Sequence, residues 1–137
     1  MNLVDVHCHL NSIEFKDDLD DVLERAKKVG LKAILVSGTN PPTNKQVLEL
    51  AKKYPIIKAS LGIYPTDALG MPPDEAGLLK HDGPIDLEQQ FEFIRKHLSQ
   101  VAAVGEVGMD FYWVDKEKTG QQQEDNFRKI IRFCKEI

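Results

Sequence analysis

Hydrophobic positions along the chain alternate between two spacings, one typical of buried strands and one typical of helices. Short apolar runs rich in branched residues predict four strands, at 3–7, 32–38, 56–65 and 101–111, the last running into a loop. Apolar residues at intervals of three and four predict four helices, at 17–30, 44–55, 86–99 and 122–136. Strands and helices therefore alternate along the whole chain.

Strands that alternate with helices predict a parallel sheet joined by right-handed crossovers. The apolar runs show no inside–outside alternation, so burial on both faces is expected. No G-x-G-x-x-G follows the first strand, which leaves a dinucleotide-binding sheet without support. A (β/α)8 barrel takes about 250 residues. The 137 residues therefore predict an α/β fold, a parallel (βα)4 half of a TIM-type (β/α)8 barrel.

A single domain is expected over residues 1–137, interrupted by an irregular excursion at 66–84. This excursion contains glycine and proline at Gly70, Pro72, Pro73, Gly77, Gly83 and Pro84. Such residues break regular structure, so a helical turn is the most that we predict there.

Composition narrows the classes of function. The chain is 42% hydrophobic and 29% charged, as a folded domain is. A net charge of −4 argues against a broad basic surface, although an enzyme can also hold phosphate through metal ions. No apolar run approaches the roughly 20 residues of a membrane helix, and no signal-peptide pattern opens the chain. Cys8 and Cys134 lie outside any C-x-x-C pair, so free thiols and a cytoplasmic location are expected.

Two histidines end the first predicted strand. His7 and His9 are two residues apart, so on a strand both imidazoles point the same way and can reach one ion. Cys8 points to the other face and is interpreted as a packing residue. The alternative is a hydrogen-bonded histidine pair in a packed strand. The location at a strand terminus, where functional groups of parallel folds gather, favours the metal.

Two carboxylates accompany the histidines. Asp5 shares their strand face, and it either orients an imidazole or bonds to backbone or to Lys58. Glu106 follows four apolar or glycine residues, so we expect a metal ligand or a catalytic base; a buried ion pair with arginine is the alternative. Two histidines and a carboxylate suit Zn, Mn, Fe, Ni or Mg.

Other polar residues follow the predicted strands. Ser37 and Thr39 can donate to substrate oxygens, but such hydroxyls more often bond to backbone. Asp110, in the loop after the fourth strand, either pairs with a cation or caps a turn.

Four motifs together resemble the TatD family of metal-dependent hydrolases, which are amidohydrolase-type barrels. They are DVHCHL (5–10), GIYP (62–65), VGEVGMDFY (104–112) and Q-x-x-x-F (123–127). The resemblance implies deoxyribonuclease-like hydrolysis of phosphodiester bonds, typically in DNA, by metal-activated water with one or two divalent ions. It implies that His7 and His9 bind one ion, that Glu106 binds one ion or bridges two, and that Tyr64 and Asp110 face the substrate.

The sequence departs from the family pattern in two ways. Tyr64 stands where the family usually has histidine, which keeps open a related barrel enzyme that hydrolyses amides or esters. The family also continues into further strands with two more histidines and an aspartate. We therefore expect half of an active site on half of a barrel, with open edges at the first and fourth strands.

Three explanations follow: a truncated chain, a second half supplied by another chain, or a homo-oligomer formed through the open edges. A non-catalytic truncated module is a separate alternative to an enzyme. Because of these open edges, we expect that the chain associates in solution and does not behave as a single monomeric species.

Overall fold

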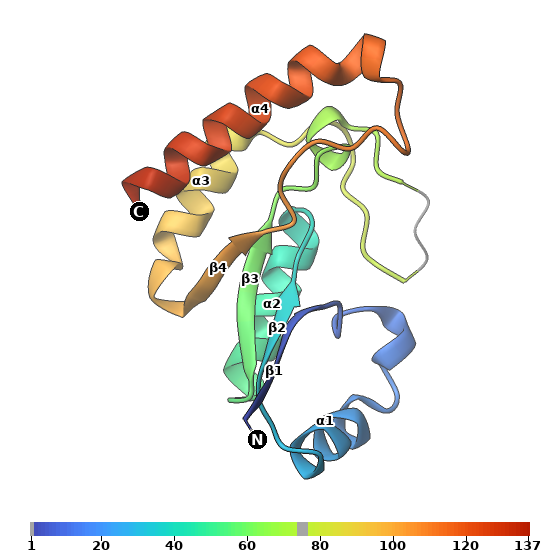
Figure 1. The fold of residues 1–137 in the computed structure, drawn as a ribbon, viewed down its shortest axis with the longest axis vertical. Helices are drawn as coiled ribbons and strands as arrows, with labels where there is room; N and C mark the ends of the chain where they lie inside the picture. Colours follow the sequence, from blue (N-terminus) through green and yellow to red (C-terminus); the bar gives the residue numbers. More distant parts are fainter. Residues whose placement is uncertain (1, 74–76) are drawn as a thin grey trace.

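Strands and helices alternate in the fold as the hydrophobic pattern predicts. The computed structural model describes residues 2–73 and 77–137, and within them a single four-stranded parallel sheet runs in the order β1-β2-β3-β4 (Figure 1). The strands are β1 (Leu3–Cys8), β2 (Leu31–Ser37), β3 (Ile57–Gly62) and β4 (Val101–Gly105). Each pairs in parallel with its sequence neighbour. The predicted α/β class and parallel order are confirmed, and β1 and β4 are the edges of this sheet.

The helices are α1 (Leu19–Lys28), α2 (Pro41–Lys53), α3 (Leu87–Lys96) and α4 (Lys116–Glu136). Two of them begin earlier than predicted. Asn40 and Thr43 form a reciprocal capping box, and proline fills the first positions of α2, where a missing N–H costs nothing. Asp115 caps α4 by accepting from the Glu117 amide, ahead of a polar turn that has no apolar period.

Three short 3-10 turns complete the described elements: η1 (Ile13–Phe15), η2 (Asp67–Leu69) and η3 (Leu98–Gln100). The helical turn predicted within 66–84 is η2. Residues 74–76 of that excursion lie outside the described residues. The third and fourth strands end at Gly62 and Gly105, sooner than predicted, and the loops that carry candidate site residues follow directly.

The core lies between the sheet and the helices. Leu61 on central strand β3 is fully buried, as are Val47 of α2 and Ile94 of α3. Phe91 and Phe133 stack with ring centroids 4.3 Å apart, which joins α3 to α4. Burial of each such side chain stabilises the fold by about 1.5–3 kcal/mol. Among the described residues no helix is long and apolar enough to span a membrane.

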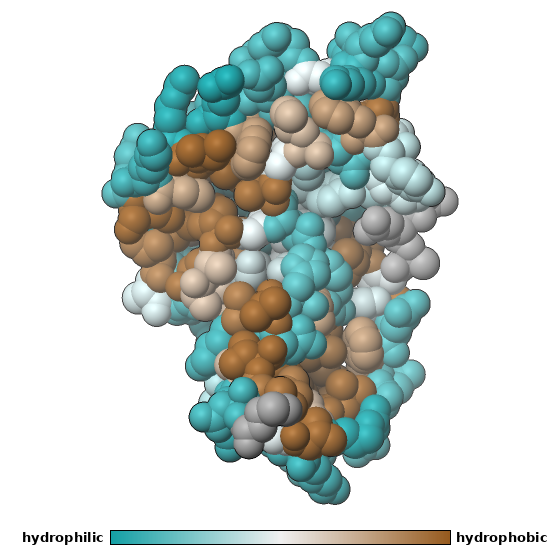
Figure 2. All heavy atoms as spheres, in the orientation of Figure 1, coloured by the Kyte–Doolittle hydropathy of each residue, from teal (hydrophilic) through white to brown (hydrophobic). Residues whose placement is uncertain are grey.

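The second face of β1 is open, which corrects the expectation that every strand is buried on both faces. Val4 and Val6 are 51% and 69% exposed, whereas nearly all of β3 is buried. Hydrophobic side chains gather over β1 on the face drawn in Figure 2. The continuous apolar run that predicted burial therefore includes side chains that no described element covers.

Candidate metal centre

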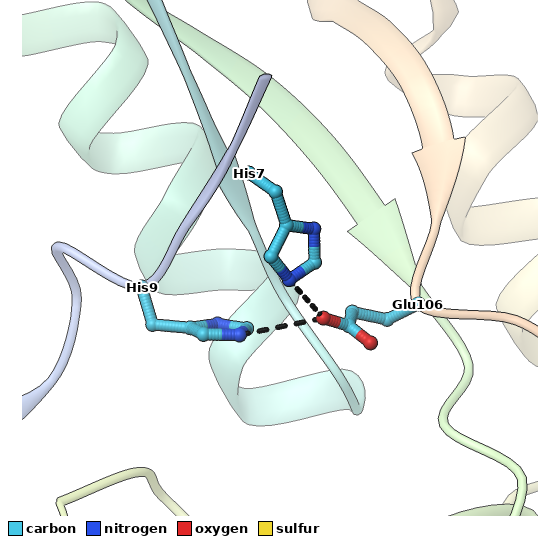
Figure 3. A group of neighbouring side chains, drawn as sticks. All are labelled: His7, His9 and Glu106. Carbon is cyan, nitrogen blue, oxygen red and sulfur yellow. Dashed lines mark ion pairs between the residues drawn. The ribbon is translucent and has the colours of Figure 1, made fainter. Parts of the chain in front are cut away.

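The carboxyl ends of the two edge strands bring the predicted ligands together. His7 lies near the end of β1, His9 follows it, and Glu106 follows β4. His7 Nε2 lies 2.6 Å from Glu106 Oε1, and His9 Nε2 lies 3.3 Å from the same oxygen (Figure 3). The candidate ligand atoms of all three residues lie within 4.8 Å of one another. About a hundred residues of sequence separate these groups, and the fold closes that separation.

Glu106 is aimed at the histidines by an unusual backbone conformation. Its φ is +47°, in the left-handed region that non-glycine residues seldom occupy and that clusters at functional sites. Gly62 lies against it: a Cβ on Gly62 would fall 2.7 Å from the Glu106 Cβ and 2.0 Å from the Gly38 carbonyl oxygen. The glycine in β3 therefore leaves the space that Glu106 needs.

Ser37, at the end of β2, lies beside both rings. His9 Nδ1 is 2.9 Å from the Ser37 carbonyl oxygen, and His7 Nδ1 is 3.5 Å from the Ser37 hydroxyl. A carbonyl oxygen only accepts, so the proton of a neutral His9 is on Nδ1 and the Nε2 lone pair faces Glu106. Two acceptors that face each other require a proton or a cation between them. The donor set therefore fits a divalent ion.

The electrostatics agree with this fit. Without a cation, a protonated His9 donates from Nε2 to Glu106, and this bond lowers the pKa of the Glu106 carboxyl below its usual value, against the effect of burial and together with the charges of His7 and His9. The Glu106 side chain is 16% exposed, whereas that of His7 is 53% exposed. The group therefore has a largely buried, ionised carboxylate on one side and an exposed imidazole on the other.

The neighbours of the histidines on β1 have other contacts. Asp5 Oδ1 accepts from the His7 backbone N–H at 3.0 Å. Of the partners considered for this carboxylate, an imidazole, the backbone or Lys58, this bond is to the backbone. The Cys8 thiol donates to the Leu35 carbonyl at 3.5 Å. Burial and the charge of Asp5 raise the pKa of Cys8 to about 11, although a bond to the Leu10 backbone opposes this. Cys8 thus packs apart from the candidate ligands, and both cysteines are free.

A second polar cluster holds the loop after Glu106. The Tyr64 hydroxyl donates to Asp110 Oδ2 at 2.9 Å. Asp110 Oδ1 accepts from the backbone N–H groups of Tyr112 and Trp113, at 2.9 and 3.0 Å. Burial opposes ionisation of Asp110, but the bonds from Trp113, Tyr64 and Tyr112 lower its pKa overall. Asp110 therefore caps the turn that leads towards α4.

Sequence reasoning missed two positioning roles. Gln123 of α4 is 1% exposed and bonds to the main chain of Asp110, and its only sequence signal was membership of a family motif. Ser37 was expected to bond to backbone or substrate, and it lies instead beside the two histidines. The signal for Ser37 is its place at the end of β2, the strand that pairs with β1.

A parallel α/β sheet with candidate histidine and carboxylate ligands at its strand ends places the chain among α/β proteins with a candidate divalent-metal centre. The sequence profile of the family described as TatD related DNase matches residues 4–137. The chain belongs to this family.

Individual relatives agree with this assignment. The chain is 33% identical over 135 residues to YabD, an uncharacterized metal-dependent hydrolase of Bacillus subtilis, with 98% of this chain and 47% of that protein covered. It is also 33% identical over 135 residues to the 3'-5' ssDNA/RNA exonuclease TatD of Salmonella typhimurium, covering 98% of this chain and 46% of that protein.

The fold matches that of a solved relative. The crystal structure of YjjV, a TatD homolog from Escherichia coli, superposes with a TM-score of 0.76 at 28% identity, covering 98% of this chain and 47% of that one. The chain therefore spans about half the length of the relatives it matches, and its four strands correspond to about half of a TatD barrel.

Proposed function

We propose that this chain forms part of the active site of a metal-dependent hydrolase that cleaves phosphodiester bonds of DNA. The observation that carries the proposal is that the Nε2 atoms of His7 and His9 both lie close to the same carboxylate oxygen of Glu106. The nuclease name of the Salmonella relative supports the substrate class. In such a site a divalent ion activates water and neutralises charge on the phosphate.

The residues of the chain have distinct parts in this proposal. His7 and His9 present their Nε2 atoms, and the Ser37 carbonyl fixes the tautomer of His9. Glu106 Oε1 lies between the rings while its other oxygen points away from them (Figure 3), an arrangement suited to one ion or to two. The ion is Zn, Mn, Mg, Fe or Ni, the metals that a mixed nitrogen and oxygen set accepts.

Tyr64 and Asp110 belong to the substrate side in this proposal, through the loop that they hold rather than through direct contact with phosphate. The Tyr64 hydroxyl proton is directed at Asp110, and the Asp110 carboxylate would repel a phosphate. We assign both residues to loop positioning.

The assembly is also part of the proposal. Residues 1–137 form one domain, and its exposed β1 edge pairs with another half-barrel that contributes further metal ligands. The partner half is either a second copy of this chain or additional polypeptide. Two free thiols accord with a cytoplasmic protein.

Metal titration tests the site without depending on turnover. Calorimetric titration with Mn²⁺ is expected to give at least tenfold weaker binding for His7→Ala and for Glu106→Gln. His81→Ala, a histidine in the 66–84 segment, is the matched control and is expected to bind as the parent does. Hydrolysis of a single-stranded oligonucleotide follows the same order. Equal Mn²⁺ affinity in all four proteins would contradict the assigned ligands.

A further inference from the structure

The loop between β4 and α4 displays four large apolar side chains at the surface. Met109 is 47% exposed, Phe111 37%, Tyr112 84% and Trp113 48%. The rings of Tyr112 and Trp113 meet edge to face, with centroids 4.8 Å apart and planes at 89°. Adjacent aromatic residues this exposed contribute little to the core, so their placement needs another explanation.

This aromatic pair is held in place. Asp110 accepts the backbone N–H groups of both Tyr112 and Trp113, and Gln123 holds the main chain of Asp110. Phe111 lies against α4, with Lys116 Nζ 5.5 Å from its ring centroid. The backbone that carries the pair is therefore held in place, which lowers the entropic cost of binding.

The pair also lies within reach of the candidate metal centre. Tyr112 is the sixth residue after Glu106, so their Cα atoms are at most about 22 Å apart. Both belong to the connection that leaves the carboxyl end of β4, the end of the sheet at which ligands of parallel folds bind.

We propose that Tyr112 and Trp113 form a stacking platform for a nucleobase of a single-stranded nucleic acid, a role that rests on the proposed phosphodiesterase function. Every base has a π-face, so aromatic stacking gives affinity without sequence preference. It also suits a chain of net charge −4, which cannot rely on a broad basic surface. In a duplex the base faces are already stacked, which makes a single strand the ligand.

Trp113 provides the test, because it is the one tryptophan of the sequence. In EDTA, which prevents metal binding and turnover, an oligothymidylate of about ten nucleotides is expected to quench its fluorescence. An abasic oligonucleotide of the same length and charge is expected to quench far less. Equal quenching by both would overturn base stacking.

Variants separate stacking from other contacts. By fluorescence anisotropy of a labelled oligothymidylate, Trp113→Ala and Tyr112→Ala are expected to raise the Kd about tenfold, and Trp113→Phe to restore most of the affinity. Leu98→Ala removes an exposed apolar side chain on η3 and serves as the control. Alanine variants that lower the melting temperature or the self-association but leave the Kd unchanged would show that the pair packs against protein, and would overturn the proposal.

This test is independent of the metal centre. Unchanged Mn²⁺ affinity in His7→Ala would contradict the proposed function. Unchanged oligonucleotide affinity in Trp113→Ala would contradict the stacking platform.

Discussion

The carboxamide of Gln123 bonds to both polar groups of the Asp110 main chain. The Asp110 N–H donates to Gln123 Oε1 at 2.7 Å, and Gln123 Nε2 donates to the Asp110 carbonyl at 2.7 Å. The same nitrogen lies 3.2 Å from Thr119 Oγ1 on the preceding turn of α4. One buried glutamine thereby ties the longest helix to the loop that follows the candidate metal ligand.

Removal of this link is predicted to destabilise the fold. Gln123→Ala leaves two main-chain groups of Asp110 without their partner and opens a small cavity, at a cost of about 2–3 kcal/mol. The melting temperature is expected to fall by roughly 10 °C in a thermal scan followed by circular dichroism. Gln122→Ala, an exposed glutamine one residue earlier, should melt as the parent does. Equal losses in both variants would show that helix propensity, not the link, is responsible.

The Ser37 hydroxyl is predicted to support the metal centre. Ser37→Ala removes the oxygen beside His7 Nδ1 but keeps the carbonyl that accepts from His9. Because groups that orient ligands contribute to affinity, we expect Mn²⁺ binding about tenfold weaker by calorimetry, with the melting temperature nearly unchanged. Ser99→Ala, an exposed serine on η3, is the control. Full affinity in Ser37→Ala would remove this residue from the centre.

Acid titration of the metal-free protein tests the ionised state of Glu106. Its pKa is lowered in the folded chain from an ordinary value of 4.5, so its contribution to stability is present above that ordinary value and is lost as pH falls through the folded value. At about pH 5.5, where ordinary histidines are mostly protonated, Glu106→Gln is expected to lose about 1–2 kcal/mol in urea unfolding.

This difference should shrink as the pH falls below 4.5. Glu88→Gln, an exposed acid on α3, should show no such pattern. A Glu106→Gln deficit that persists undiminished to the lowest pH at which the protein stays folded would contradict an ion pair with the histidines.

The two thiols are predicted to differ in reactivity. The raised pKa of Cys8, about 11, leaves roughly one thiolate in a thousand at pH 8. Burial also raises the pKa of Cys134, but that residue is exposed on α4. Iodoacetamide followed by peptide mass analysis should modify Cys134 first, and Cys8 should react about tenfold faster for each unit of pH until its pKa is approached. Faster labelling of Cys8 at pH 8 would contradict its packing against Leu35.

Hydrophobic spacing predicted the order of the strands and helices because each element buries apolar side chains at the spacing typical of its own type. It missed the starts of α2 and α4, where proline, asparagine and a polar turn form helix through capping rather than through an apolar face. It also overstated the burial of β1. An apolar run shows that its side chains favour burial, but it does not show whether another element packs against them. The exposed Val4 and Val6 show the difference.

The candidate site was predictable where chemistry and position coincide. His7 ends the first predicted strand, His9 follows it, and Glu106 lies within the fourth predicted segment, 101–111. The parallel order brings these residues to one side of the sheet. Ser37 and Gln123 were harder, because serine and glutamine have common structural roles and their contacts depend on the orientation of side chains across two elements. The left-handed backbone conformation of Glu106 could not be predicted, because the sequence usually indicates such a conformation by a glycine and this residue is a glutamate.

The candidate ligands come from the two outermost strands of the sheet, with β2 and β3 between them. His7 on β1 and Glu106, which follows β4, meet only while the sheet is curved, so ion binding and sheet curvature would be thermodynamically linked. An ion bound by both His7 and Glu106 would stabilise the curved sheet. By linkage, the curved sheet would bind that ion more tightly, and the two free-energy changes would be equal. Metal affinity at the proposed centre would therefore also measure how far the four strands are bent towards a closed barrel.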